Sequence, residues 1–165
     1  MTIAQIMKKM IAFSEGNVHD IDHFMKVWTY AKTIGELEQI DEKTQYILEV
    51  AAITHDIACP LCRVKYGNTN GKYQEEEGGP LVTEFLSDTG MTKEQISRVS
   101  YLVGHHHTLT GIEGMDYQIL IEADYIVNAT ESGYSRENVG NFVEKIMKTG
   151  SGKEIARDIL LTKEK

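Results

Sequence analysis

Two imidazoles and two carboxylates stand where the apolar pattern of the chain predicts buried side chains. His55 comes directly after the largely apolar run 47–54, and Asp56 is its neighbour. Asp124 interrupts the apolar stripe of a later helix, and His23 leads the apolar face of an earlier one. Burying an imidazole or a carboxylate without a partner is costly, so such groups pair with one another or bind a metal. The four positions are therefore candidate metal ligands.

A single divalent cation would satisfy all four side chains at once. Mixed nitrogen and oxygen ligands suit Fe, Mn, Ni, Co or Zn, and Mg is also considered. Taken singly, each residue has an ordinary interpretation: a lone histidine fits a hydrogen-bonded core position, and Asp124 alone fits a helix cap or an arginine partner. The set of four favours the metal. We expect one ion and leave a second open.

Apolar residues that recur at helical spacing position these ligands. The periodicity predicts helices along most of the chain, without a convincing strand. We expect an all-α fold, a helical bundle of seven or eight helices in one domain over residues 1–165, with core motifs in 18–130 and C-terminal helices in 135–161. Asp20 or Asp22 can cap the helix that carries His23. Residues 59–74 contain turn-forming residues and are predicted to form a loop.

Composition narrows the class of partner. The 165 residues include 25 acidic and 17 basic side chains, a net charge of −8 that argues against binding nucleic acid. No apolar run approaches the roughly 20 residues of a spanning helix, so no membrane interaction is expected. The two cysteines, Cys59 and Cys62, cannot build a disulfide framework, and their CxxC spacing lacks a redox or zinc context. We predict a cytoplasmic protein and treat the cysteine pair as incidental.

The ligand candidates and their surroundings resemble the HD-domain metal-dependent phosphohydrolases over about residues 18–130. That family carries a histidine on one helix, a His-Asp pair at the end of another and an aspartate on a later one. The matching segments here are Asp22-His23-Phe24, Thr54-His55-Asp56-Ile57 and Glu122-Ala123-Asp124-Tyr125. The resemblance implies a helical bundle, a bound cation and hydrolysis of a phosphate ester or anhydride in a small phosphorylated substrate, commonly a nucleotide. Asp56 would bind the metal and orient the attacking water. A homodimer is left open.

The segment His105-His106-His107 could extend the metal site. Two-metal relatives supply additional histidines before the last aspartate, and His106 continues an apolar helix face, so it is the best inward candidate. His105 is a candidate for substrate binding. A plain helix C-terminal cap is the alternative, because imidazolium is favourable there.

Acidic and basic residues near the predicted loop complete the candidate set. Glu77 is assigned a catalytic role in placing water or substrate, although a solvated first helical turn explains the run 75–77 as well. Arg63, Lys65 and Lys72 are candidate phosphate ligands, since both side-chain types bind phosphate, but surface solvation explains them equally.

Two other functions use the same scaffold. One is a non-catalytic nucleotide-binding or signalling module. The other is a di-iron oxygenase, which would require a further ligand pair such as His105 and His106.

Overall fold

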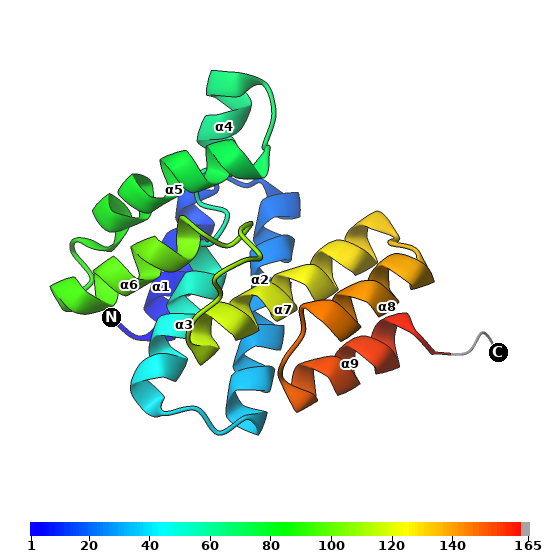
Figure 1. Cartoon of the computed structure of the whole chain (residues 1–165). Coiled ribbons are helices and arrows are strands. Elements are labelled where there is room, and N and C mark those ends of the chain that lie inside the picture. Colours follow the sequence, from blue (N-terminus) through cyan, green and yellow to red (C-terminus); the bar gives the residue numbers. More distant parts are fainter. Residues whose placement is uncertain (163–165) are drawn as a thin grey trace.

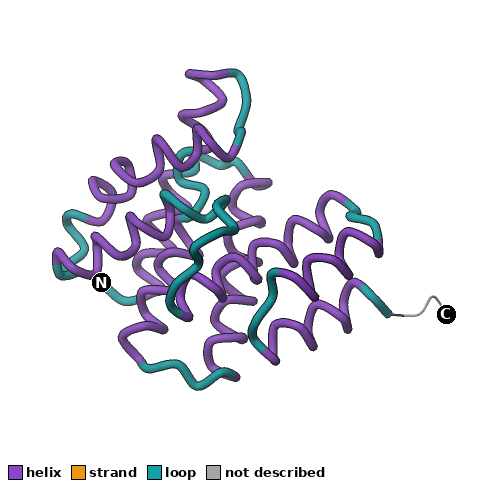
Figure 2. The backbone as a smooth tube through the Cα atoms, viewed as in Figure 1, coloured by secondary structure: helices purple, strands orange, loops and turns teal. Residues whose placement is uncertain are grey.

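The computed structural model describes residues 1–162 of the chain; the last three residues of the predicted domain, 163–165, lie outside this range. The described part contains helices and connecting loops without a strand (Figure 2). The all-helical prediction is confirmed. The described residues form α1 (Ile3–Phe13), α2 (Val18–Leu37), α3 (Glu42–Thr54), α4 (Cys59–Tyr66), α5 (Gly71–Leu86), α6 (Lys93–Val103), α7 (Met115–Ser132), α8 (Arg136–Lys145) and α9 (Gly150–Leu160).

Helices α2, α3 and α7 pack against one another in the middle of the bundle (Figure 1). The other helices surround them: α1 and α6 lie on α3, α5 pairs with α6, and α9 lies on α7. In α7 the residues 116–124 are all buried. The buried apolar side chains join in one continuous cluster, which holds the three central helices in fixed relative positions.

Side-chain caps fix where several helices begin. Thr92 and Gln95 form the capping box that starts α6, and Asp41 caps α3. The prediction for α2 is wrong, because Asn17 caps this helix by accepting a hydrogen bond from the backbone N–H of Asp20. The side chain of Asp20 is therefore free for another partner.

The loop predicted over 59–74 is largely helical. Helix α4 begins at Cys59, and Pro60 fits its first turn because an N–H there would have no helical partner. Gly67, with φ of 72°, ends α4 in the left-handed conformation, and α5 starts soon afterwards at Gly71. Gly78 lets α5 approach α6 closely, since a Cβ there would lie 2.8 Å from Val103 Cγ1. Short helices with little apolar periodicity are hard to recognise from sequence.

None of the helices in residues 1–162 has the length and apolar character needed to cross a membrane. The cytoplasmic location and the single-domain organisation stay predictions.

A buried carboxylate joins α7 to the C-terminal helices. Glu122 is fully buried and accepts hydrogen bonds from Gln118 Nε2 at 2.7 Å and from Thr149 Oγ1 at 2.6 Å. The backbone N–H groups of Lys148 and Thr149 also donate to it. This network holds the segment between α8 and α9 against α7.

Replacing Glu122 tests the energetic weight of this network. Glu122→Ala leaves several buried donors unpaired, so we expect the free energy of unfolding to fall by about 3 kcal/mol. Urea denaturation followed by circular dichroism measures the loss. Glu154→Ala, on the exposed side of α9, is the control and should change stability by less than about 0.5 kcal/mol. Equal stability of the two variants would contradict the anchoring role.

Candidate metal centre

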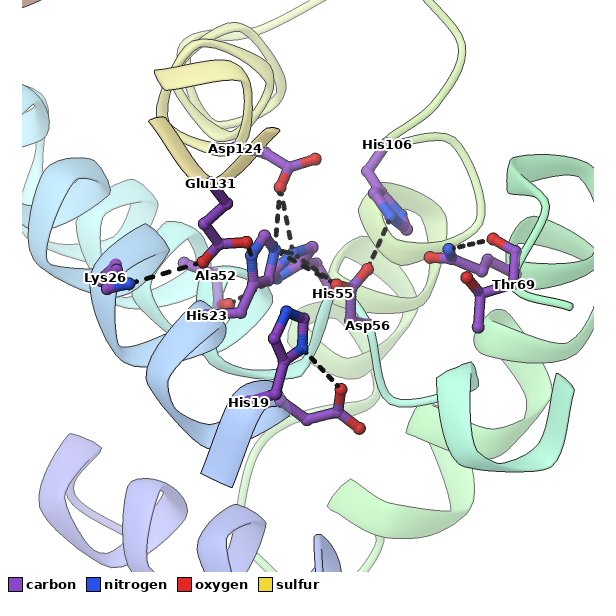
Figure 3. Close-up of polar contacts among 12 residues, drawn as sticks. His19, His23, Lys26, Ala52, His55, Asp56, Thr69, His106, Asp124 and Glu131 are labelled. Carbon is purple, nitrogen blue, oxygen red and sulfur yellow. Dashed lines mark hydrogen bonds and ion pairs between the residues drawn. The ribbon is translucent and has the colours of Figure 1, made fainter. Parts of the chain in front are cut away.

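Three central elements bring four polar side chains to one point (Figure 3). His23 Nε2 lies 3.2 Å from His55 Nε2, 3.2 Å from Asp56 Oδ2 and 3.2 Å from Asp124 Oδ1. His55 Nε2 lies 3.4 Å from each of the same two carboxylate oxygens. His23 comes from α2, Asp124 from α7, and His55 and Asp56 from the turn that follows α3.

Local structure explains why these side chains point inward. His23 and Val27 lie on the buried face of α2, which faces α3 and α7. His55 still has helical backbone angles at the end of α3, so its side chain continues the buried face of that helix. Asp124 occupies the middle of α7, where Leu120, Ile121 and Val127, about one turn away, are buried and apolar. The packing of the three helices therefore determines the geometry of the cluster.

Hydrogen bonds orient the imidazole rings. The Nδ1 of His55 donates to the carbonyl of Ala52 at 2.8 Å, and the Nδ1 of His23 faces Glu131 Oε2 at 3.0 Å. With the proton on Nδ1, each ring directs the lone pair of Nε2 into the cluster. An acceptor on the second ring nitrogen is the usual arrangement for a histidine that binds a metal.

The electrostatics of the cluster favour a positive charge at its centre. Burial lowers the pKa of His55, but the carboxylates of Asp56 and Asp124 outweigh burial and hold the pKa well above its usual value. The pKa of His23 is raised as well, with burial opposed by Asp124 and Asp56. Burial raises the pKa of Asp124, yet the neighbouring histidines hold it well below its ordinary value.

The cluster fits a divalent cation. Asp124 Oδ1 is buried and has no hydrogen-bond partner in the described part of the chain. Ligand atoms of a tetrahedral site about 2.0–2.1 Å from the metal are separated by about 3.3 Å. The two Nε2 atoms lie 3.2 Å apart and 3.2–3.4 Å from the two carboxylate oxygens, which agrees with that geometry. Two neutral imidazoles and two carboxylates would hold an Fe, Mn, Ni, Co or Zn ion.

A second group of potential ligands shares Asp56 with the first. Asp56 Oδ2 belongs to the cluster described above, while Asp56 Oδ1 lies 3.3 Å from His106 Nε2. His106 is buried, its Nδ1 donates to the carbonyl of Val103 at 2.7 Å, and its Nε2 lacks a hydrogen-bond partner among residues 1–162. Asp56, His106 and His107 form a set of side chains close enough to share an ion. His106 is thus directed into the core beside Asp56.

The other residues predicted for the site divide into two groups. Arg63 lies in the wall of a 260 Å³ cavity that also contains His23, Asp56 and Asp124. Its guanidinium donates to both oxygens of Asp20, at 2.6 and 2.7 Å. This pair connects α4 with the first turn of α2, next to the metal centre.

Glu77, Lys65, Lys72 and His105 are not brought to the centre. Glu77 accepts hydrogen bonds from Lys65 and from Tyr66, because the unexpected helix α4 presents these two residues to α5. Lys72 is exposed at the start of α5. The ring of His105 stacks on Tyr101 with 4.0 Å between ring centroids, because the turn after α6 directs only His106 into the core.

Sequence reasoning missed Glu131 and did not predict that His107, a member of the segment 105–107, would contact Gln74. Glu131 lies seven residues after Asp124, on the same face of α7, and helical spacing could have identified it as the partner of His23. His107 and Gln74 approach from two other elements, and His107 Nε2 lies 3.0 Å from Gln74 Oε1. No local sequence pattern indicates this contact, because it depends on how α5 and the turn after α6 pack together.

Comparison with known proteins gives matches at the level of structure. No family model and no curated protein matches the sequence. A predicted HD superfamily hydrolase from an uncultured Thermotogales bacterium is 23% identical, with a TM-score of 0.68 over 95% of this chain and 82% of that one. Bacillus subtilis YpgQ in complex with ADP is 22% identical, with a TM-score of 0.65 over 96% and 87%. The Lin1889 protein from Listeria innocua is 18% identical, with a TM-score of 0.62 over 98% and 91%.

Metal affinity tests the cluster directly. We expect the purified protein to bind Mn²⁺ or Zn²⁺ in isothermal titration calorimetry, and His55→Ala to weaken binding by more than about 100-fold. Glu131→Ala removes only the acceptor behind His23 and should cost about 10- to 100-fold. His105→Ala is the matched control, because this histidine is turned away from the cluster. Similar affinities for His55→Ala and His105→Ala would exclude the site.

The raised histidine pKa values predict how metal binding depends on pH. A metal needs neutral imidazoles, so protons compete with it below the raised pKa values, and affinity should fall by up to about tenfold per pH unit for each histidine. In the metal-free protein the effect of pH runs in the opposite direction, because protonated histidines stabilise the fold. The stability that His23 and His55 contribute is complete below about pH 6.5 and is lost as the pH rises through their raised pKa values. Thermal unfolding with chelator and with Mn²⁺ at several pH values measures both effects. If the unfolding temperature depends on pH in the same way in both conditions, the assignment of His23 and His55 as metal ligands is contradicted.

Proposed function

The chain has the HD-domain fold, as its sequence predicted, and we propose that it is a metal-dependent phosphohydrolase acting on a small phosphorylated compound, with nucleotides as the favoured class. The observation that carries this proposal is the convergence of His23, His55, Asp56 and Asp124 from separate parts of the chain. A cation bound there would lower the pKa of a bound water and hold a phosphoryl oxygen.

Asp56 is the residue best placed to handle the proton of the attacking water. One of its oxygens belongs to the ligand cluster, and the other faces His106 at 3.3 Å. In the proposed mechanism the oxygen of the water forms its bond to phosphorus as the bond from phosphorus to the leaving oxygen breaks. One proton of the water passes to Asp56 Oδ1, with His106 Nε2 in reach to share it, and a proton is returned to the leaving oxygen. Burial of His106 keeps this exchange away from bulk water.

Arg63 is the proposed phosphate clamp. Hydrogen bonds to Asp20 hold its guanidinium group in place. The remaining N–H groups of the guanidinium are available to phosphoryl oxygens in the 260 Å³ cavity. Fixed donors of this kind stabilise the charge that develops on the transferred group. His23 and His55 keep their orientation through Glu131 and the carbonyl of Ala52.

The complex of Bacillus subtilis YpgQ with ADP supports the nucleotide as substrate class. The fold likeness to a predicted HD superfamily hydrolase supports the reaction class. Asp56, His106 and His107 could hold a second ion. A di-iron oxygenase would use the same two ion sites. The two reactions consume different co-substrates and are separable by experiment.

A substrate panel tests the proposal. With Mn²⁺, the protein should release phosphate or pyrophosphate from at least one nucleoside mono-, di- or triphosphate, without consuming oxygen. His55→Ala and Asp56→Ala should abolish release, and Arg63→Gln should lower kcat/KM by about 100-fold. The control His105→Ala should keep full activity. Tight binding of metal and nucleotide without turnover would instead indicate a non-catalytic module, and oxygen uptake would indicate an oxygenase.

A further inference from the structure

A second, larger cavity opens beside the metal centre, between α7 and α8. Its volume is 520 Å³, in the range of sites that enclose small organic molecules. At one end it is lined by Asp124, His106 and His107, so it is continuous with the metal cluster. Asn128 belongs both to this cavity and to the smaller one that contains Arg63. A ligand with its reacting group at the metal centre could therefore extend into either cavity.

One face of α8 forms the wall opposite α7. Asn138, Asn141 and Lys145 lie at positions i, i+3 and i+7 of this helix and all line the cavity. Val139 and Val143 are buried in the core on another face of the same helix. The helix is thus anchored by its apolar face, and a separate face carries polar groups that the fold itself does not need.

The amide groups of this wall are available to a ligand. Asn128 and Asn141 make no side-chain hydrogen bond within residues 1–162, and Asn138 uses only its oxygen, as acceptor from the hydroxyl of Tyr125. Each free amide can donate and accept hydrogen bonds, which suits a group that presents both kinds of partner on one edge.

The remaining lining is flat and apolar. Tyr125 of α7 and Phe142 of α8 stack on each other with 3.6 Å between centroids and an interplanar angle of 2°, so their facing ring surfaces are covered and the pair closes one side of the cavity. Tyr134 lines the cavity at a 53° tilt to Tyr125 and is 41% exposed. The open ring of Tyr134 is the face on which a planar ring can stack.

The charge distribution separates the two cavities. The smaller one is lined by Arg63 and by the carboxylates of Asp20, Asp56, Asp124 and Glu131, so a phosphate there would need the cation of the cluster beside Arg63. The larger one has Lys145 and Asp124 as its lysine and its carboxylate. A chain of phosphates needs several donors or cations, and one ammonium opposite a carboxylate does not supply them. The larger cavity is suited to an uncharged, planar group rich in hydrogen-bonding atoms.

We propose that the cavity between α7 and α8 is the subsite for the nucleobase of the substrate, read by Asn128, Asn138 and Asn141 and stacked against Tyr134. The inference rests on the proposed function, because it assigns the phosphate end of the same substrate to the metal centre and Arg63. It makes the protein selective for nucleotides over inorganic polyphosphates. Amide groups that pair with a base edge also give it a preference among bases.

Free nucleosides test this subsite without phosphate, metal or turnover. Adenosine, guanosine, cytidine, uridine and thymidine are titrated into the ¹⁵N-labelled protein, with ribose as the matched ligand that lacks a base. At least one nucleoside should bind about 10-fold or more tightly than ribose and shift the side-chain amide signals of Asn128 and Asn141. Asn141→Leu should weaken the binding of that nucleoside by about 5- to 10-fold. Asn141 is exposed, so this variant should fold, and Arg63→Gln should leave nucleoside binding unchanged.

The result is independent of the hydrolase assay. If no nucleoside binds better than ribose, or if Asn141→Leu and Arg63→Gln behave alike, the subsite is wrong even when phosphate release is observed. If nucleosides bind as expected but no nucleotide is hydrolysed, the proposed activity fails and the subsite stands. Where hydrolysis occurs, Asn141→Leu should raise KM for the preferred nucleotide.

Discussion

The structure depends on the burial of imidazole and carboxylate side chains where α2, α3 and α7 meet. His23, His55 and Asp124 are almost fully enclosed, and Asp124 Oδ1 has no hydrogen-bond partner among the described residues. With neutral imidazoles, the two carboxylates of the cluster cost stability unless a cation joins them. The surrounding core must therefore be rigid enough to hold the cluster, and the mutual packing of α2, α3 and α7 provides that rigidity.

The elements around this core have separate tasks. Helix α4 brings Arg63 to the smaller cavity, α5 and the turn after α6 bring Gln74 and His107, and α8 brings Asn138 and Asn141 to the larger cavity. Asp56 links these parts, since its two oxygens face different histidines. One carboxylate thus lies between the ligand cluster and the second group of potential ligands.

Much of the centre could be predicted because its signals are local. A polar residue within an apolar stripe, as at Asp124, identifies a buried ligand without knowledge of the fold. The misplaced residues depended on tertiary contacts. Lys65 and Glu77 pair because α4 is a helix, and a segment with Pro60 and a cluster of turn-forming residues gives little indication of one. His105 and His106 are adjacent, so only the turn after α6 decides which ring faces inward. The sequence did not predict the cavity-lining amides of Asn128, Asn138 and Asn141, because they come from two helices that only the fold brings together.

The attachment of α8 has a consequence for how such a protein can diversify. This helix is held by Val139 and Val143 and, through the segment after it, by the Glu122 network, while its cavity-facing positions carry little of the packing. Exchanges at positions 138, 141 and 145 can therefore alter the chemical preference of the cavity at small cost in folding energy. The reactive centre would be inherited intact by every such variant, so selectivity and reactivity can evolve along independent routes.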